Sequence, residues 1–292
     1  MSKSLKRQAS QCIEEMKDAE AVIPLLEEFI AADGDVNLKA KKTTFLCEAC
    51  RYGHLEVVKY LHEQGAIINK RDESGCTPLY IAASFGHLEL VRYLLGCGAN
   101  TEIMNNTGYT AVLSALQNNK IPCVRLLIDH GANVNVKRPN TVGLDLDVLT
   151  YTLFAKGDVD LTMKVIEAGA MPGKIVSPLG YIMLEDKEID VDFVKKVRYS
   201  GFHIESAKNW LTVMKSRMSN DLQNLSQNQI DLAKFIEYML RNPLTLQQSC
   251  RITVRKYVIK SANPERKHFK DRLRSLPDLP DILIKYLTLE YI

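Results

Sequence analysis

The sequence predicts an all-α fold, a solenoid in which helix pairs are stacked one after another, because three features repeat together. Similar residues recur every 33 positions along three successive segments. Each segment contains two short apolar stretches with the spacing of helices, which Gly53 and Gly86 divide in the first two segments. Polar turn residues separate one segment from the next. The recurring positions are Thr44, Ala49, Gly65 and Ala66, then Thr77, Ala82, Gly98 and Ala99, then Thr110, Ala115, Gly131 and Ala132.

The middle segment, residues 71–103, indicates how each unit is built. Thr77 is expected to cap a helix N-terminus, and Pro78 follows at the first helical position, where its missing N–H costs nothing. Ala82 and Ala83 are small, so this first helix can approach its neighbours closely. Residues 71–75 are polar turn material that is expected to project between units.

A second helix is expected after Gly86, because glycine permits the sharp turn that must follow a short helix. Leu88, Val91 and Leu94 form an apolar stripe on this second helix. Gly98 suits the left-handed conformation at its C-terminal end. Such a unit buries its apolar faces only against its neighbours, so a single unit is not expected to be stable.

The order Thr-Pro-Leu, Ala-Ala, Gly-His-Leu-Glu and Gly-Ala-Asn in residues 77–100 resembles the ankyrin repeat. Tyr80 departs from the family pattern, which usually has His at this position. The resemblance implies a helix pair and a projecting hairpin in each unit, and a curved solenoid of such units. The clearest repeats are residues 38–70, 71–103 and 104–136.

Weaker units are expected on both sides of these three. Residues 23–37 resemble the second helix and exit turn of an N-terminal capping unit. Residues 165–170 echo residues 127–132 after 38 positions, and we expect the five extra residues in a loop at 137–147. With a further degenerate unit, the predicted array covers residues 1–205.

The remainder of the chain leaves the repeat pattern. Residues 206–242 contain two helical stretches, near 210–218 and 230–240, and form either a degenerate final repeat or a linker. The last segment, residues 243–292, opens with an apolar stripe in which residues four apart share one helix face. Its members are Leu246, Cys250, Val254 and Val258.

This last segment resembles the SOCS box, a small three-helix element, and the whole chain resembles the ankyrin repeat and SOCS box family. Leu246, Cys250 and Val254 match the family's elongin-binding pattern, in which the leucine enters an apolar pocket on elongin C, the partner of elongin B. The resemblance gives a cullin-selecting role to Pro277, Leu279, Pro280, Leu283, Tyr286 and Leu287.

The cullin-selecting part departs from the family's Leu-Pro-aliphatic-Pro pattern. The aligned stretch here is Pro277-Asp278-Leu279-Pro280, and Leu276 with Pro277 stands one residue early. The elongin assignment is unaffected by this departure, but the choice of cullin is left open. Cullin-5 with its RING protein is the favoured expectation.

A target protein is expected to bind the array on one concave strip. Aromatic residues one repeat apart, Tyr52 and Phe85, would form a contact ladder, and aromatic residues are enriched at binding hot spots. The alternative is that these rings only pack on the adjacent hairpin. The predicted target-binding residues are Arg51, Tyr52, Arg71, Glu73, Ser84, Phe85, Met104, Asn106, Gln117 and Asn118.

Composition favours a soluble intracellular protein, cytoplasmic with nuclear presence allowed. The net charge of +3 is too small to indicate nucleic acid or membrane binding, and no apolar run approaches the ~18 residues that cross a bilayer. Residues 251–274 hold nine Lys or Arg against two acids, which is more typical of a solvated basic face than of a nucleic-acid site. No secretory signal is expected at the N-terminus.

Seven scattered cysteines do not form a disulfide framework or a metal site in this interpretation. Cys47 and Cys50 have CxxC spacing, but Cys50 occupies a small-residue packing position of the repeat, so core packing is expected. His54 and His87 recur at one repeat position and are expected to form structural hydrogen bonds in the turn. No metal and no cofactor are expected.

No phosphate-binding loop, zinc-protease motif or nucleophile elbow is present, so the chain is not expected to be an enzyme. The resemblance implies a substrate-recognition adaptor that binds a target through its repeats and binds elongins B and C and a cullin through its C-terminal box. The alternative is an ankyrin scaffold or inhibitor whose C-terminal helices only cap the array.

Overall fold

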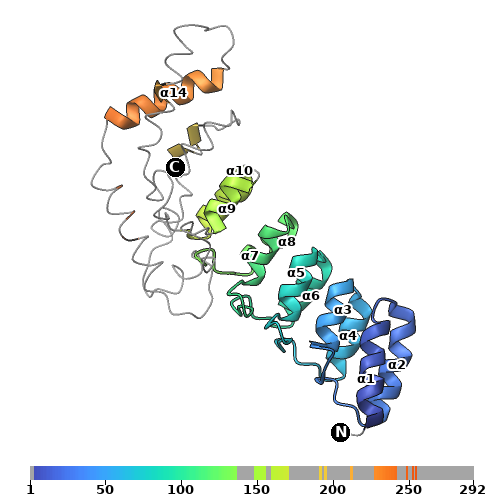
Figure 1. Ribbon diagram of the computed structural model, residues 1–292. Coiled ribbons are helices and arrows are strands. Elements are labelled where there is room, and N and C mark those ends of the chain that lie inside the picture. The colour runs from blue at the N-terminus through green and yellow to red at the C-terminus, as the bar shows by residue number, and fades with distance from the viewer. Residues whose placement is uncertain are drawn as a thin grey trace, which may run out of the picture. The chain divides into compact units, whose positions relative to one another are not determined.

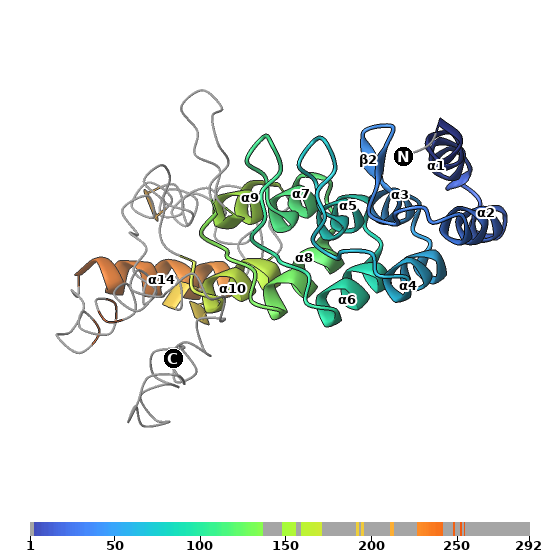
Figure 2. The same ribbon diagram turned by 90° about the horizontal axis from the view of Figure 1, so that it is seen from below.

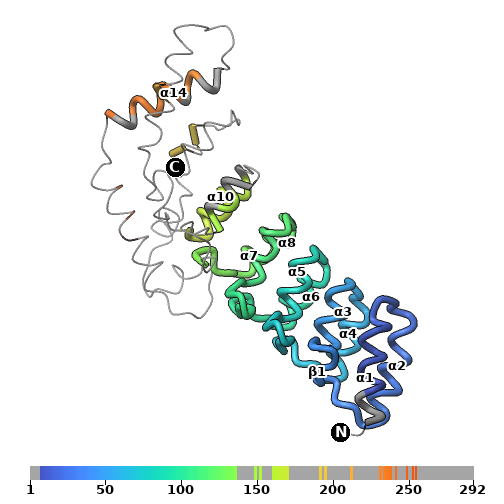
Figure 3. Tube along the Cα trace, viewed as in Figure 1, coloured from blue at the N-terminus to red at the C-terminus, as the bar shows by residue number. Residues whose placement is uncertain are grey.

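The computed structural model (Figures 1 and 3) has a helix pair in each of the three clear repeats, residues 38–70, 71–103 and 104–136. It divides into two units, residues 1–132 and residues 133–292, which are described separately. The described residues are 3–136, 148–155, 159–170, 191–192, 194–195, 211–212 and 227–241, with 248, 252 and 254.

The first unit opens with a helix hairpin of α1 (Lys3–Glu15) and α2 (Ala19–Ala31). Asp18 caps α2, since its Oδ1 accepts hydrogen bonds from the backbone N–H of Glu20 at 2.9 Å and of Ala21 at 3.3 Å. The predicted capping helix in residues 23–37 is confirmed as part of α2. Helix α1 was not predicted, although its buried residues, Ala9, Cys12 and Ile13, have helical spacing, which Met16 continues just after the helix ends.

A short β-hairpin opens the first clear repeat, residues 38–70. Strands β1 (Lys39–Ala40) and β2 (Thr43–Thr44) pair antiparallel, with Lys39 opposite Thr44. The turn between them places Lys41 and Lys42 at φ of 49° and 72°, a left-handed conformation that is costly for a residue with a side chain. The hairpin therefore stores local backbone strain at an exposed tip.

Each clear repeat contributes one helix to each of two layers (Figure 2). The first layer contains α3 (Phe45–Tyr52), α5 (Pro78–Phe85) and α7 (Ala111–Gln117). The second layer contains α4 (Leu55–Glu63), α6 (Leu88–Gly96) and α8 (Ile121–Asp129). The β1–β2 hairpin and the loops before α5 and α7 project from the same edge. This arrangement confirms the predicted solenoid of helix pairs within the first unit.

The helix starts confirm the predicted caps only in part. Thr44 Oγ1 accepts from the backbone N–H of Cys47, and Thr77 Oγ1 accepts from that of Tyr80, both at 3.1 Å. Thr110 occupies the same place before α7, but its buried hydroxyl has no hydrogen-bond partner. The third repeat thus keeps the threonine and lacks the side-chain cap.

The turn between the two helices also changes in the third repeat. Gly53 and Gly86 have φ of 85° and 86°, as the turn prediction requires. Asn119 takes the equivalent place after α7 at φ 58°. Asparagine is one of the few residues with a side chain that adopt this conformation readily, so the turn is preserved. The conformation still costs more free energy for asparagine than for glycine.

Burial in the core confirms that the predicted small residues and the two CxxC cysteines pack inside, and it corrects the predicted apolar face of α6. Ala82, Ala83, Cys47 and Cys50 are buried. On α6 the buried residues are Leu90, Val91 and Leu94, whereas Leu88 is only half-buried, so the predicted stripe was wrong at its first member. Leu88 is the first residue of α6, where fewer neighbouring side chains surround it.

The second unit contains a further helix pair, α9 (Val148–Ala155) and α10 (Val159–Glu167). Gly169 follows α10 at φ 98°, and its carbonyl accepts a 3.0 Å hydrogen bond from Asn135 Nδ2. The predicted echo at residues 165–170 is confirmed, because Ala170 N donates to Val165 O as Ala132 N donates to Leu127 O.

Helix α14 (Gln227–Arg241) covers the helical stretch predicted near residues 230–240. The other stretch, near 210–218, is described only at residues 211–212, and the 137–147 loop lies outside the described residues. Within the described part of the chain, no helix has both the length and the apolar character of a bilayer span.

Candidate protein-binding surface

The ten predicted target-binding residues occupy two kinds of position in the first unit, and we name them together the target strip. Six lie at the C-terminal ends of the first-layer helices, and four lie on the loops before α5 and α7. The helix-end members are Arg51, Tyr52, Ser84, Phe85, Gln117 and Asn118. The loop members are Arg71, Glu73, Met104 and Asn106.

The two aromatic side chains of the target strip are exposed and held in place. Tyr52 is 36% exposed and Phe85 is 47% exposed. The Tyr52 ring stacks on His54 with ring centroids 6.1 Å apart, and the Phe85 ring stacks on His87 at 6.2 Å. Each ring therefore presents apolar surface to solvent while one neighbour restricts its motion.

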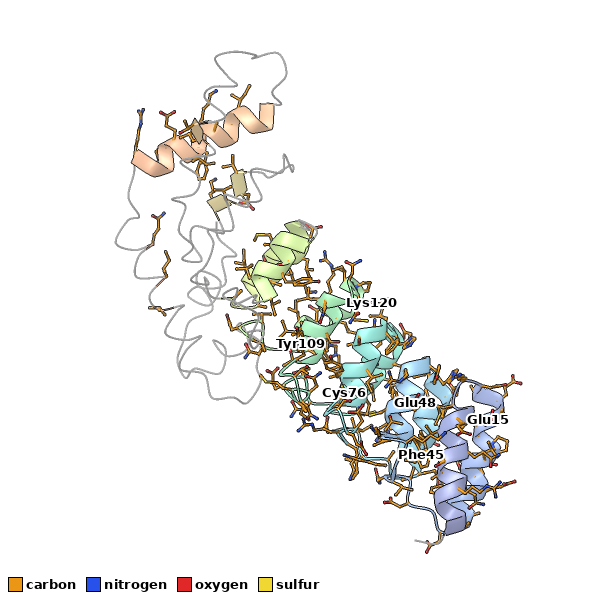
Figure 4. The ribbon with its side chains drawn as sticks, viewed as in Figure 1. Glu15, Phe45, Glu48, Cys76, Tyr109 and Lys120 are labelled. Carbon is orange, nitrogen blue, oxygen red and sulfur yellow. The ribbon has the colours of Figure 1, made fainter. Side chains whose placement is uncertain are left out.

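The repeated histidines form the structural hydrogen bonds that were predicted. His87 Nε2 lies 3.0 Å from the backbone oxygen of Arg51, and His54 Nε2 lies 3.2 Å from that of Lys17. Each histidine thus connects its own turn to the preceding helix pair. In the third repeat Lys120 takes this position (Figure 4). The Lys120 side chain lies so close to Gly86 that a Cβ added at Gly86 would be 2.7 Å from Lys120 Cδ.

Arg51 links the first two repeats on the target strip. Its Nε donates to Glu48 Oε2 at 3.2 Å, and its guanidinium lies over the Phe85 ring, 5.6 Å from the centroid. The Phe85 ring is therefore in contact with Arg51 and with His87. Sequence reasoning missed Glu48 (Figure 4), whose (i, i+3) spacing to Arg51 on α3 was the available indication.

The loops of the target strip are tied to one another by hydrogen bonds. Arg71 donates from Nε to Gly75 O at 2.9 Å and from a terminal nitrogen to Asn106 Oδ1 at 3.1 Å. Asn106 Nδ2 donates to Glu73 O at 2.8 Å. Because each bond joins neighbouring loops or closes one, the loop members of the strip are held at fixed spacing before any partner binds.

One further hydrogen bond and one exposed side chain belong to the strip. Asn118 Nδ2 donates to Ser84 Oγ at 3.1 Å, which connects the ends of α5 and α7. Met104 is an exposed large hydrophobic residue on the loop before α7. The strip therefore contains three exposed apolar side chains, Tyr52, Phe85 and Met104, among polar groups that already hold one another.

Cys76 is a second residue of this surface that sequence reasoning did not assign (Figure 4). It is half-buried just before α5. Burial raises the pKa of the Cys76 thiol and the Asp72 charge adds to this, while a hydrogen bond with Asn105 and the charges of Arg51 and Arg71 act in the opposite direction. Both guanidinium groups therefore lie near Cys76.

Cys47 and Cys50 pack in the core as predicted. Both are fully buried, and Cys47 Sγ lies 3.8 Å from Lys70 O and 3.7 Å from Cys76 O. Burial raises the pKa of Cys47 to about 12 and raises that of Cys50 well above its usual value. The CxxC spacing thus places two neutral thiols inside the repeat.

The predicted elongin-binding and cullin-binding residues fall mostly outside the described residues. Val254 is described as helical, with its side chain 43% exposed, and Ile252 beside it is buried. The remaining predicted residues of this segment lie outside the described part: Leu246, Cys250, Pro277, Leu279, Pro280, Leu283, Tyr286 and Leu287. Their roles stay predictions.

Comparison with known families gives two matches. The family model for ankyrin repeats, in three copies, matches residues 10–105 and again residues 46–138. The family model for the SOCS box matches residues 242–288. The chain matches no curated protein sequence with which it was compared. The first match covers the helix pairs that carry the target strip, and the second covers the segment predicted to bind elongin C.

Proposed function

Since the chain belongs to the ankyrin repeat and SOCS box family, we propose that it is a substrate-recognition subunit of an elongin B/C–cullin–RING ubiquitin ligase. Proteins with these two elements are protein-binding adaptors of elongin–cullin ubiquitin ligases, and both elements are non-catalytic binding modules. The specific proposal is that the target strip binds a protein target while the C-terminal box binds elongin C and a cullin.

The observation that carries the target-binding part is the pair of exposed aromatic rings, Tyr52 and Phe85, one repeat apart. Exposed aromatic side chains that are already restricted lose little conformational freedom when a partner covers them. Phe85 is restricted by Arg51 and His87, and Tyr52 by His54. The hydrogen-bonded loops beside them would supply a preformed polar rim.

The ligase-recruiting part of the proposal rests on the C-terminal pattern. Leu246, Cys250 and Val254 would contact elongin C, which binds together with elongin B. The cullin would be selected by Pro277, Leu279, Pro280, Leu283, Tyr286 and Leu287, with cullin-5 favoured. The box would thereby connect a bound target to the RING protein, in the cytoplasm and with nuclear presence allowed.

The chain would contribute proximity to the reaction. Ubiquitin is transferred by a conjugating enzyme elsewhere in such a complex, and binding a lysine-bearing target beside it turns a bimolecular encounter into an effectively intramolecular one. The side chains of this protein would therefore choose the target and hold it, and would take no part in bond formation.

Co-expression with elongins B and C tests the proposal. The native chain is expected to co-purify with both elongins, and Leu246→Ala with Cys250→Ala is expected to abolish this, because burying each such side chain is worth about 1.5–3 kcal/mol. The matched control is Tyr52→Ala with Phe85→Ala, two truncations far away in sequence, which should leave elongin capture unchanged.

The result that would overturn the proposal is a native chain that does not capture elongin C at micromolar concentration. The protein would then be a scaffold or inhibitor, with Leu246 and Cys250 buried against the last repeat. Circular dichroism on each variant establishes that lost capture does not come from lost helix content.

A further inference from the structure

Three side chains with acid–base chemistry meet on the second layer of helices, outside the target strip. His62 lies on α4, Tyr93 lies on α6, and Cys97 follows the last residue of α6. His62 Nδ1 is 2.9 Å from the Tyr93 hydroxyl oxygen and 3.7 Å from Cys97 Sγ. The His62 and Tyr93 rings meet edge to face, with centroids 6.0 Å apart. A thiol, an imidazole and a phenol are therefore within hydrogen-bonding reach of one another.

The phenol in this cluster acts as a hydrogen-bond donor at neutral pH. Burial raises the pKa of Tyr93 to about 12, and the hydrogen bond with Cys97, the charge that Cys97 would carry as a thiolate and the charge of Glu63 add to the effect. Tyr93 therefore keeps its proton. If the Cys97 proton moves to His62, both the imidazolium and the phenol can donate hydrogen bonds to the sulfur, and donors of this kind stabilise a thiolate.

Cys97 is half-buried, and the chain on either side of it is exposed. Its neighbours Gly96 and Gly98 are exposed, and a Cβ built on either would meet no atom within 4 Å. Among the described cysteines, Cys97 and Cys76 are the half-buried members, and the others are buried: Cys12, Cys47, Cys50 and Cys123. Of these two half-buried thiols, Cys97 lies within reach of an imidazole, since its Sγ is 3.7 Å from His62 Nδ1.

We propose that Cys97 is a thiol-modification site that forms a mixed disulfide with a low-molecular-weight disulfide such as oxidised glutathione, with His62 as the proton acceptor. A nucleophilic thiol beside an imidazole is the arrangement that general-base activation requires.

The exchange balances without any further oxidant. The Cys97 proton passes to His62 Nδ1, and the thiolate attacks one sulfur of the disulfide. A new S–S bond forms at Cys97 as the S–S bond of oxidised glutathione breaks. The second glutathione leaves as a thiolate and takes up one proton, so the thiol of Cys97 is oxidised and one half of the reagent is reduced.

Glu63 offers a second test of the proposal, because it places a negative charge beside the proposed base. It follows His62 on α4, and its charge raises the pKa of Tyr93. A negative charge near a thiol disfavours the negatively charged thiolate. Removing this charge and removing the base should therefore change the reactivity of Cys97 in opposite directions.

Oxidised glutathione added to the full native chain at neutral pH tests the proposal, with each cysteine-containing peptide quantified by mass spectrometry over time. Cys97 is expected to react roughly tenfold faster than Cys76, since thiolate character sets the rate of exchange. His62→Gln should slow the modification of Cys97 roughly tenfold, and Glu63→Gln should accelerate it. Neither change should alter the rate at Cys76, which is the internal control.

Two results would overturn this assignment. One is equal modification of Cys97 and Cys76 in the unaltered chain, a comparison that does not depend on any variant folding correctly. The other is an unchanged Cys97 rate in His62→Gln when helix content matches the native chain. The proposal does not rest on elongin capture, so its failure and the failure of the ligase function are separate observations.

Discussion

Arg51 lies over the ring of Phe85 while its backbone oxygen is hydrogen-bonded to His87, the residue on which Phe85 stacks. Arg51 and His87, from two consecutive repeats, therefore both contact the exposed Phe85 ring, and the hydrogen bond between them holds the two contacts together. A ring held in this way can contribute its apolar surface to a partner at small entropic cost. Phe85 is accordingly the residue at which we expect target affinity to be most sensitive.

The first prediction concerns this aromatic pair. Tyr52→Ala with Phe85→Ala should weaken target capture by about 2 kcal/mol or more, because aromatic anchors dominate interface energies. The target is first identified by affinity purification from cells, and binding to it is then titrated. Arg92→Ala on the second layer is the matched control and should bind as the native chain does. Full affinity in the double variant, or loss of its fold, would exclude the aromatic pair as the binding anchor.

The second prediction concerns the two threonines that begin α5 and α7. Thr77→Val should destabilise the array by about 1 kcal/mol, because the hydroxyl caps α5. Thr110→Val should be neutral or stabilising, since a buried hydroxyl without a partner is replaced by a methyl of the same shape. Urea denaturation of both variants measures the difference. Equal destabilisation would mean that Thr110 makes a hydrogen bond in solution.

The third prediction concerns the turn after α7. Asn119→Gly should stabilise the array and Asn119→Ala should destabilise it by about 1 kcal/mol, because φ 58° favours glycine and penalises a β-carbon. Gly86→Ala is the matched substitution one repeat earlier and should cost more, since its Cβ would also meet Lys120 Cδ at 2.7 Å. Thermal denaturation ranks the three variants. A more stable Asn119→Ala would contradict the left-handed turn.

The fourth prediction concerns alkaline pH. Burial raises the pKa of Cys47 from 9.0 to about 12, so above pH 9 the unfolded chain releases this proton while the folded chain keeps it. Stability should therefore fall as pH rises, with a slope that approaches ~1.4 kcal/mol per pH unit once the unfolded thiol is fully ionised. In Cys47→Ala the fall in unfolding free energy between pH 9 and 10 should be smaller by about 1 kcal/mol, because the unfolded thiol is only half ionised at pH 9. Identical slopes in the two proteins would show that Cys47 is not buried as described.

The sequence predicted the helix pairs because their spacing is set by local rules. Threonine caps, glycine turns and apolar periodicity act within a few residues, and Thr77 and Gly86 behave as expected. Helix α1 was missed because residues 1–10 are polar, and its buried face shows only once α2 and α3 are beside it. Leu88 was misplaced because burial at a helix start depends on neighbours and not on period alone.

The surface was harder to predict than the fold for the same reason. The sequence shows that Tyr52 and Phe85 are 33 residues apart. It does not show how Phe85 is restrained, because the restraint depends on the direction of the Arg51 side chain, which its hydrogen bond to Glu48 fixes. Likewise, the meeting of His62 with Cys97 spans 35 residues and two helices, a separation that no local pattern records.

The asparagines at the exit turns have a mechanical consequence. Asn37 holds the next turn on both sides, since its Nδ2 donates to Gly65 O at 3.0 Å and its Oδ1 accepts from Ile67 N at 2.8 Å. Asn69 does the same one repeat later, since its Nδ2 donates to Gly98 O and its Oδ1 accepts from Asn100 N. A force applied at the N-terminus would act first on the hydrogen bonds of the Asn37 amide. Those of Asn69 would bear the force only after the hydrogen bonds of Asn37 have broken. Under a steady pull, the first unit should therefore peel from its end in steps of one repeat.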